Sequence, residues 1–308
     1  MLGILQNSSF FEYFCAVESS KWQKMILIAD SGSTKTDWVV FNPSVQDPMF
    51  NVQSSIISTQ GLNPVHQTSE TILRILRDEL LPQLNIPITA VYFYGSGVRP
   101  ELESLMVSVL HEIFLQAETV EAHSDMLGAA RALCGHNEGI ASILGTGANS
   151  CLYDGYGIRR NTPAMGYILG DEGSGASLGK RLIHDLYKGV LSKEIANTFE
   201  CETSLTLPDL IDKVYRQPLP NRFLASLSTF IHNHLDDPSI RHMVVACFSD
   251  FFAYNIVPYG RPDLPVNFVG SIAFYYQDEL REAAKRQGFH LGSVLRSPLE
   301  GLVRYHQG

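Results

Sequence analysis

The feature that most constrains this sequence is a strand–turn–strand unit that occurs twice. The first unit spans residues 25–41 and turns at Ser31–Thr36, and the second spans residues 140–153 and turns at Gly145–Ala148. Both turns are rich in Gly, Ser and Thr, and both are flanked by apolar segments. Glycine lets a turn adopt positive φ and lets backbone N–H groups approach an anion closely. Two such turns therefore predict two loops that hold one polyphosphate.

Composition narrows the class of protein. The chain has 308 residues, enough for one large domain or two lobes, and 45% of them are hydrophobic and 18% charged, as in ordinary globular proteins. Its formal net charge is -9 and no Lys/Arg cluster stands out, which argues against nucleic acid as the main partner. No apolar run is long enough to span a bilayer, so no membrane partner is expected.

The five cysteines are far apart and form no CxxC pair; they are Cys15, Cys134, Cys151, Cys201 and Cys247. An odd and scattered set suits reduced thiols in a cytoplasm better than a disulfide framework.

Residues 1–24 lack both a basic start and a clear helix or strand period, so they make a poor signal peptide. Met25 stands directly before the first strand. We expect residues 1–24 to be an extension outside the fold; a genuine amphipathic N-terminal segment is the alternative.

Strand and helix patterns alternate in the front half of the chain, whereas the pattern is mostly helical from Leu178 onward. Two α/β lobes hinged near residue 128, the second rich in helix, fit this order. The expected strands after the first unit are 90–93, 120–122 and 266–269. The expected helices include 178–190, 207–214, 223–234, 239–255, 272–287 and 299–306.

The first turn carries candidate phosphate and metal ligands. Backbone N–H groups of Gly32–Lys35, with the hydroxyls of Ser33 and Thr34, are placed to hold the β- and γ-phosphates. Asp30 precedes the turn and can hold Mg²⁺ through water, because Mg²⁺ usually keeps much of its hydration. The turn is not a Walker loop, since it leads into a strand rather than a helix. A plain hairpin with a charged turn is the alternative.

Asp125 lies between the two turns, where a helix begins. A carboxylate there can cap backbone N–H groups. It can also be the general base that a kinase needs to accept the proton of the attacking hydroxyl. The local sequence leaves both roles open.

Two further loops carry polar groups. The segment Gly170–Gly175 places two acids in a glycine-rich loop before a helix, where they can orient sugar hydroxyls or a metal, or else cap the helix. Gly61–Pro64 is a turn by its composition, and its Asn63 can hold a polar ligand.

In this order, the motifs resemble the N-acetylglucosamine kinase branch of the BadF/BadG/BcrA/BcrD ATPase family, within the sugar kinase/Hsp70/actin superfamily. The likeness extends from Met25 to about the C-terminus. The segments that carry it are 29–36, 59–64, 124–125, 143–150, 170–174 and 269–271.

The resemblance implies a two-lobed actin-like fold, a duplicated ribonuclease H-like arrangement with lobes at 25–128 and 129–296. The closing segment 297–308 would return to the first lobe. It also implies a cytoplasmic enzyme, possible as a homodimer, that uses ATP and Mg²⁺ to phosphorylate an amino sugar. The favoured reaction converts N-acetylglucosamine to its 6-phosphate.

The resemblance also assigns roles to individual residues. Asp125 would be the base acting on the sugar 6-hydroxyl, and Asp30 the acid on the Mg²⁺ side. The sugar would be held by Asn63, Asn149 and Asp171. The nucleotide would be held by the first phosphate loop (Gly32, Ser33, Thr34, Lys35 and Thr36), by the second (Gly145, Thr146 and Gly147), and by Gly270 and Ser271 beside the adenosine.

One departure concerns the sugar. Animal kinases of this branch carry a Gly-Trp pair where this chain has Ala164-Met165, so N-acetylmuramic acid, glucosamine and N-acetylmannosamine remain alternatives.

Three other readings compete with this one. An activator of a radical dehydratase would need cysteines for an iron–sulfur cluster, and a ROK-type kinase a zinc-binding cysteine cluster. A non-catalytic nucleotide or sugar sensor is the third reading. Asp30, Asp125 and Asp171 favour an enzyme.

Overall fold

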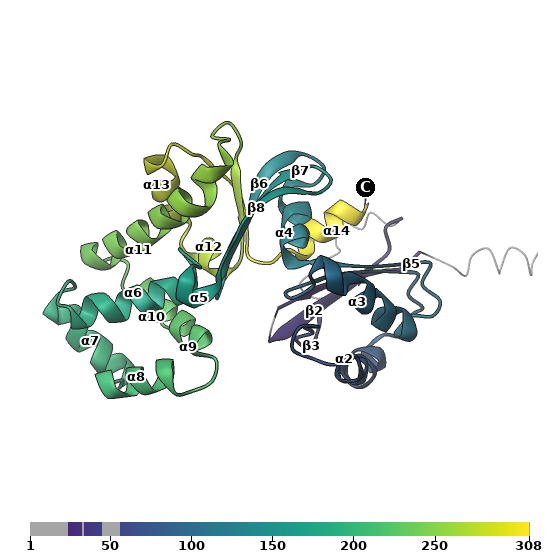
Figure 1. Ribbon diagram of the computed structural model, residues 1–308, viewed down its shortest axis with the longest axis horizontal. Coiled ribbons are helices and arrows are strands. Elements are labelled where there is room, and N and C mark those ends of the chain that lie inside the picture. Colours follow the sequence, from purple (N-terminus) through teal and green to yellow (C-terminus); the bar gives the residue numbers. More distant parts are fainter. Residues whose placement is uncertain (1–23, 33, 45–55, 308) are drawn as a thin grey trace, which may run out of the picture. The chain divides into compact units, whose positions relative to one another are not determined.

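The computed structural model describes residues 24–32, 34–44 and 56–307 (Figure 1). The chain forms two compact units, each described here by itself. The first unit contains the residues up to Asp125 together with those from His306 onward, and the second contains Met126–Tyr305. The chain passes between the units inside two helices, α4 (Asp125–Cys134) and α14 (Leu299–Gln307). The division therefore falls at 125/126, close to the predicted hinge, and most of α14 belongs to the second unit.

The first unit is built on a mixed five-stranded sheet of order β3-β2-β1-β4-β5. Strand β1 pairs antiparallel with β2 and parallel with β4, and its continuous apolar sequence explains why it is almost fully buried. The strands are β1 (Ile26–Ser31), β2 (Lys35–Phe41), β3 (Ile56–Gln60), β4 (Ala90–Gly95) and β5 (Thr119–Ser124).

Helices cover one face of this sheet. Leu27, Ala29, Val91 and Phe93 point toward them, and all four belong to one buried core. The helices are α2 (Ser69–Ile75), which continues as a π turn at Leu76–Leu80 and a 3-10 turn at Leu81–Gln83, and α3 (Pro100–Ile113). Alternation along the strands leaves Asp30, Tyr94 and His123 on the opposite face.

The second unit repeats the sheet with the order β10-β9-β6-β7-β8. Its first strand again pairs antiparallel with the next strand and parallel with a later one. Two sheets with one topology confirm the duplicated fold predicted from the sequence. The strands are β6 (Glu138–Leu144), β7 (Ala148–Asp154), β8 (Ile158–Thr162), β9 (Val266–Val269) and β10 (Leu291–Leu295).

Helices make up most of the rest of the second unit, and the apolar faces of most of them join β6 and β9 in the largest core of the described chain. They are α5 (Gly166–Leu169), α6 (Gly175–Tyr187), α7 (Lys193–Thr203), α8 (Leu207–Tyr215), α9 (Pro220–Ser226), α10 (Ser228–Asn233), α11 (Pro238–Phe251), a π turn at Phe252–Ile256, a 3-10 turn at Val257–Tyr259, α12 (Ser271–Tyr275) and α13 (Gln277–Arg286).

Two segments predicted as single helices each form two helices. The segment 223–234 breaks near Leu227, between α9 and α10, and the segment 272–287 breaks at Tyr276, between α12 and α13. Tyr276 is buried, and its hydroxyl donates to the Ser228 carbonyl at 2.5 Å. This anchor holds the residue at φ -114°, outside helical geometry.

Two buried hydroxyls fasten the first hairpin to the following loop. The oxygens of Ser31 and Thr36 are 2.7 Å apart, and both side chains are buried. Ser31 Oγ also donates to the Leu62 carbonyl, and the Leu62 N–H donates to both hydroxyl oxygens. Because Leu62 directly precedes Asn63, this network fixes the loop that carries Asn63.

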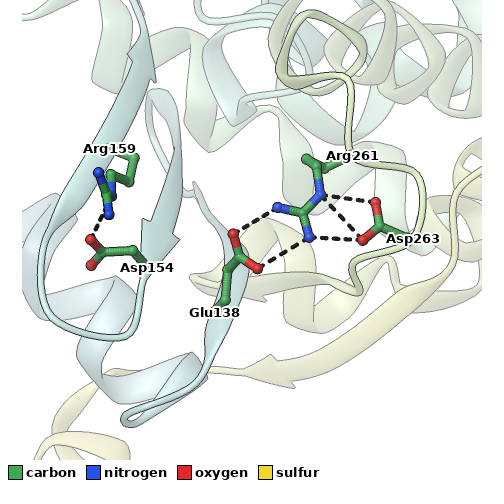
Figure 2. Close-up of polar contacts among 5 residues, drawn as sticks. All are labelled: Glu138, Asp154, Arg159, Arg261 and Asp263. Carbon is green, nitrogen blue, oxygen red and sulfur yellow. Dashed lines mark hydrogen bonds and ion pairs between the residues drawn. The ribbon is translucent and has the colours of Figure 1, made fainter.

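Exposed ion pairs lie at the end of the second sheet that is opposite its glycine turn (Figure 2). Arg261 contacts Glu138 at 2.7 and 3.1 Å and Asp263 at 2.8 Å, and Arg159 contacts Asp154 at 2.6 Å. The hydrogen bond to Arg261 lowers the pKa of Glu138. Glu138 begins β6 and Asp154 ends β7, so these pairs lie at the open end of the hairpin and link β6 to the 261–263 loop and β7 to β8.

Among the helices of the described residues, none combines the length and the apolar character needed to cross a bilayer.

We expect Thr36→Val to destabilise the first unit by about 1–3 kcal/mol, because the substitution removes the hydrogen bonds of the Thr36 hydroxyl with Ser31 Oγ, the Leu62 N–H and the Gln60 carbonyl. Urea unfolding followed by circular dichroism measures this change. Thr34→Val, at an exposed position two residues earlier, is the control and should stay within about 0.5 kcal/mol. Equal stability of the two variants would contradict a structural role for the Thr36 hydroxyl.

Candidate active site

Three acidic residues converge at one edge of the first sheet. Asp30 lies opposite Asp37 across the hairpin and opposite Tyr94 on β4. Tyr94 in turn lies opposite His123 on β5, two residues before Asp125. Side chains alternate along a strand, so Asp30 and His123 share a face. Asp125, two positions beyond His123, follows on the same side. The topology thus brings together two carboxylates that the sequence separates by 95 positions.

The electrostatics of Asp30 confirm this convergence. Burial, and then the negative charges of Asp125 and Asp37, raise the pKa of Asp30 to about 7, while Lys35 acts in the opposite direction. Like charges disfavour ionisation of a neighbour only at short range. Near neutral pH the charged form of the Asp30 carboxylate is therefore disfavoured, and a cation bound beside it would favour that form.

The first turn presents only part of the predicted phosphate loop. The Gly32 N–H donates to the Lys35 carbonyl at 3.0 Å, which closes the turn. Gly32, Thr34 and Lys35 are exposed, and Lys35 forms an ion pair with Asp37 at 2.7 Å. Thr36 is fully buried and its hydroxyl is used inside the protein, so its effect on a nucleotide would act through the shape of the turn. Ser33 lies outside the described residues.

Asn63 is held beside the end of β4. Its Oδ1 accepts from the Val65 N–H at 2.9 Å, and its own N–H donates to Gln67 Oε1 at 2.9 Å. Gly97 has φ +87°, and a Cβ there would lie 2.3 Å from Asn63 Oδ1. The chain therefore needs glycine at 97 for the amide to occupy this place.

The second turn is docked onto α6. The carbonyls of Gly145 and Thr146 accept from the N–H groups of Gly175 and Ala176 at 2.8 and 3.1 Å. Gly270 packs against the start of this turn. Its φ is +122°, and a Cβ at this position would lie 2.3 Å from the Leu144 carbonyl oxygen. Both predicted nucleotide segments of the second unit, the 145–147 turn and Gly270-Ser271, thus lie at the same edge of its sheet, with Ser271 exposed.

Asp171 supports the second turn. It is 9% exposed, its backbone adopts φ +56°, and its Oδ1 accepts from the Ala148 N–H at 3.2 Å. Burial is the main reason why the pKa of Asp171 is raised. A Cβ at Gly147 would lie 2.9 Å from Asp171 Oδ2, so the carboxylate and the turn are in contact.

Asn149 and Glu172 have partners within the second unit. Asn149 Oδ1 accepts from Asn161 Nδ2 at 2.9 Å, and Glu172 Oε2 accepts from Asn255 Nδ2 at 3.1 Å. The sugar-binding roles of Asn63, Asn149 and Asp171 stay predictions.

Asp37 is the acid that sequence reasoning missed. The predicted hairpin could have revealed it, because pairing Ser31 with Thr36 places Asp37 opposite Asp30. Its carboxylate also accepts from Ser58 Oγ at 2.6 Å.

No cluster of three or more His, Cys, Asp or Glu side chains in the described part of the chain is arranged to hold a metal ion by itself. Mg²⁺ is usually bound by one or two carboxylates together with substrate phosphates and water. Asp30 beside the exposed turn fits this second kind of site.

Comparison with solved structures gives three informative similarities. A protein of Porphyromonas gingivalis, named as a candidate N-acetylglucosamine kinase, is 47% identical with a TM-score of 0.85; the match covers 92% of this chain and 98% of that one. A protein of Chromobacterium violaceum with the same candidate name is 18% identical, with a TM-score of 0.68 over 92% and 98% of the two chains.

The third similarity concerns the fold alone. The ethanolamine utilization protein EutJ of Carboxydothermus hydrogenoformans is 15% identical, with a TM-score of 0.52 over 92% of this chain and 90% of that one.

No protein-family model matches the sequence, and no curated protein matches it. The match to the Porphyromonas protein, at 47% identity, covers 92% of this chain and therefore extends over both of its units. The chain therefore belongs to the N-acetylglucosamine kinase-like branch of the BadF/BadG/BcrA/BcrD ATPase family and is a sugar kinase with the two-lobed actin-like fold.

Proposed function

We propose that this protein transfers the γ-phosphoryl group of ATP to the 6-hydroxyl of N-acetylglucosamine in the cytoplasm. The observation that carries the proposal is the pair Asp30 and Asp125, whose charges interact at the end of the first sheet. A kinase needs one acid on the metal side of the phosphates and another facing the acceptor hydroxyl. The name of the Porphyromonas relative supports the same reaction.

Asp30 would hold Mg²⁺ through water, and Gly32, Thr34 and Lys35 would contact the phosphates from the exposed turn. Bound Mg²⁺ supplies positive charge that neutralises the transferring phosphoryl group. The raised pKa of Asp30 supports this role, because a cation near the carboxylate would favour its charged form.

Asp125 would accept the proton of the attacking sugar hydroxyl. Its place at the first residue of α4 fixes the carboxylate relative to the sheet edge. Asn63, held by its contacts with Val65, Gln67 and Gly97, would orient the sugar. Positioning of this kind contributes a large part of phosphoryl-transfer catalysis.

An exposed apolar cluster supports an N-acyl sugar. Met165, Ile168 and Leu169 are 61%, 71% and 73% exposed, and they directly precede the Asp171 loop. The Asp171 N–H donates to the Ala164 carbonyl at 3.0 Å, which ties this cluster to the loop. Apolar side chains favour an acetyl group over the charged amine of glucosamine.

The cysteines favour a kinase over an activator that carries an iron–sulfur cluster. Burial raises the pKa of the Cys134 thiol to about 11 and that of Cys151 to about 12. Iron–sulfur clusters are held by thiolates, which these two buried groups form poorly. Scattered thiols also support the proposed cytoplasmic location.

A panel of sugars tests the reaction. Purified protein with Mg²⁺-ATP is given N-acetylglucosamine, N-acetylmannosamine, glucosamine or N-acetylmuramic acid, and ADP release is coupled to NADH oxidation. We expect N-acetylglucosamine to give the highest kcat/KM. Equal ADP release with and without sugar would contradict a sugar kinase, whereas a preference for another sugar would correct only the substrate.

We expect Asp125→Asn to lower kcat by about 10²–10⁴-fold while sugar affinity changes little, because the amide cannot accept the proton but keeps the shape. Steady-state kinetics and calorimetric titration of the sugar separate the two quantities. Asp78→Asn, at an exposed carboxylate in the first unit, is the matched control. A variant with near wild-type kcat would remove Asp125 from the role of base.

Asp30→Asn should make the protein more stable at alkaline pH and less active. The folded pKa of about 7 exceeds the ordinary 3.8, so the stability that comes from protonated Asp30 is lost as pH rises between these values. At about pH 8 without divalent cations the variant should gain roughly 1–3 kcal/mol over wild type, and at about pH 5 less.

Urea unfolding at the two pH values measures this gain, and the Mg²⁺ dependence of ADP release measures the loss of function. A stability difference that does not change with pH would show that Asp30 is ionised normally. An unchanged Mg²⁺ dependence would reject its metal role.

A further inference from the structure

A buried hydroxyl that the function leaves unexplained lies at the first unit's site. Ser96 Oγ is shielded from solvent and has no hydrogen-bond partner among the described residues. Buried polar atoms in native proteins nearly always have a partner, so each exception needs a physical reason.

The position of Ser96 places it between the two carboxylates. It follows β4, which lies between β1, the strand of Asp30, and β5, the strand that leads into Asp125. Its N–H donates to the Ser31 carbonyl at 2.8 Å, which continues the parallel ladder one residue beyond the strand. Alternation along β4 puts position 96 on the face that carries Tyr94 and Asp30.

Close packing on both sides fixes the backbone of Ser96. A Cβ at Gly95 would lie 2.5 Å from the Phe93 ring, and one at Gly97 would lie 2.3 Å from Asn63 Oδ1. The loop is therefore in direct contact with the amide of Asn63, the residue predicted to hold the sugar. A sugar on that amide is also next to Ser96.

The side chain can turn without moving this backbone. Ser96 as a residue is partly exposed, although its oxygen is buried in the present rotamer. Serine has three staggered χ1 wells, and binding requires one that turns Oγ toward the exposed part of the residue. Since the hydroxyl gives up no partner among the described residues when it turns, a ligand that offers one gains the whole hydrogen bond.

We propose that Ser96 is a further substrate-binding residue, whose hydroxyl forms a hydrogen bond with a hydroxyl of the acceptor sugar. The proposal rests on the sugar kinase function. Serine both donates and accepts, as a sugar hydroxyl does, so the pair can form in either direction. Asn63 and Ser96 then bind the sugar from two adjacent loops of one unit.

Ser96→Ala tests the proposal, with Ser142→Ala as its matched control. Ser142 Oγ is likewise buried without a partner in the described chain, but it lies inside β6 of the second unit. We expect Ser96→Ala to raise KM for the sugar roughly three- to tenfold, with KM for ATP and kcat nearly unchanged. Ser142→Ala should leave all three at wild-type values.

Stability separates binding from a structural role. Neither variant removes a hydrogen bond among the residues that the structure describes, so both should unfold at or above the wild-type temperature. A lower unfolding temperature for Ser96→Ala would overturn the proposal, because the hydroxyl would then have a structural partner. An unchanged KM for the sugar, or an equal rise in KM for ATP, would also overturn it.

Deoxy analogues identify the sugar hydroxyl involved. Ser96→Ala should lose its effect on KM for the one monodeoxy sugar that lacks the partner hydroxyl, and keep it for the others. An effect that persists for every monodeoxy sugar would reject a direct contact. A wild-type protein that phosphorylates no sugar would refute the function itself, whereas an active wild type with an unaffected Ser96→Ala refutes only this inference.

Discussion

Burial of one carboxylate beside two others is the constraint around which the first unit's site is organised. Asp30 lies opposite Asp37, and its burial, followed by the charges of Asp125 and Asp37, raises its pKa to about 7. Like charges facing each other across a sheet are destabilising, so the fold must hold them there by other contacts. Strands buried on both faces do this, because their core contacts do not depend on the charges at their ends.

Neutral hydrogen bonds fix the geometry at this edge. The Ser31–Thr36 hydroxyl pair joins the hairpin to Leu62, and the contact between Gly97 and Asn63 joins the same loop to the end of β4. Hydroxyls carry no charge, so they fasten the loops without neutralising Asp30. The carboxylate is thus rigidly placed and still in need of a cation, which is the condition that a metal–phosphate ligand can satisfy.

Much of the site's location follows from the sequence, because its residues directly follow apolar strands whose carboxyl ends meet at one edge of a sheet. The start of α4 at Asp125 follows in the same way. Strand β8 escaped prediction because four of its five residues are exposed, so no apolar alternation marks it. Strand β10 also escaped prediction, because it contains Gly292 and is only partly buried. Asp37 and Ser96 could not be found by motif, since their importance depends on cross-strand register and on a missing hydrogen-bond partner.

The duplicated topology also shows where the two units differ in the placement of their acids. The ends of β1 and β6 are equivalent in the two sheets, yet β1 ends in Asp30-Ser31 and β6 in Ile143-Leu144. At the second edge the carboxylate comes instead from the 170–175 loop, where Asp171 accepts from the Ala148 N–H and so supports the glycine turn. In the first unit the acid therefore lies on the strand itself, whereas in the second an acid from a separate loop accepts the Ala148 N–H beside the glycine turn.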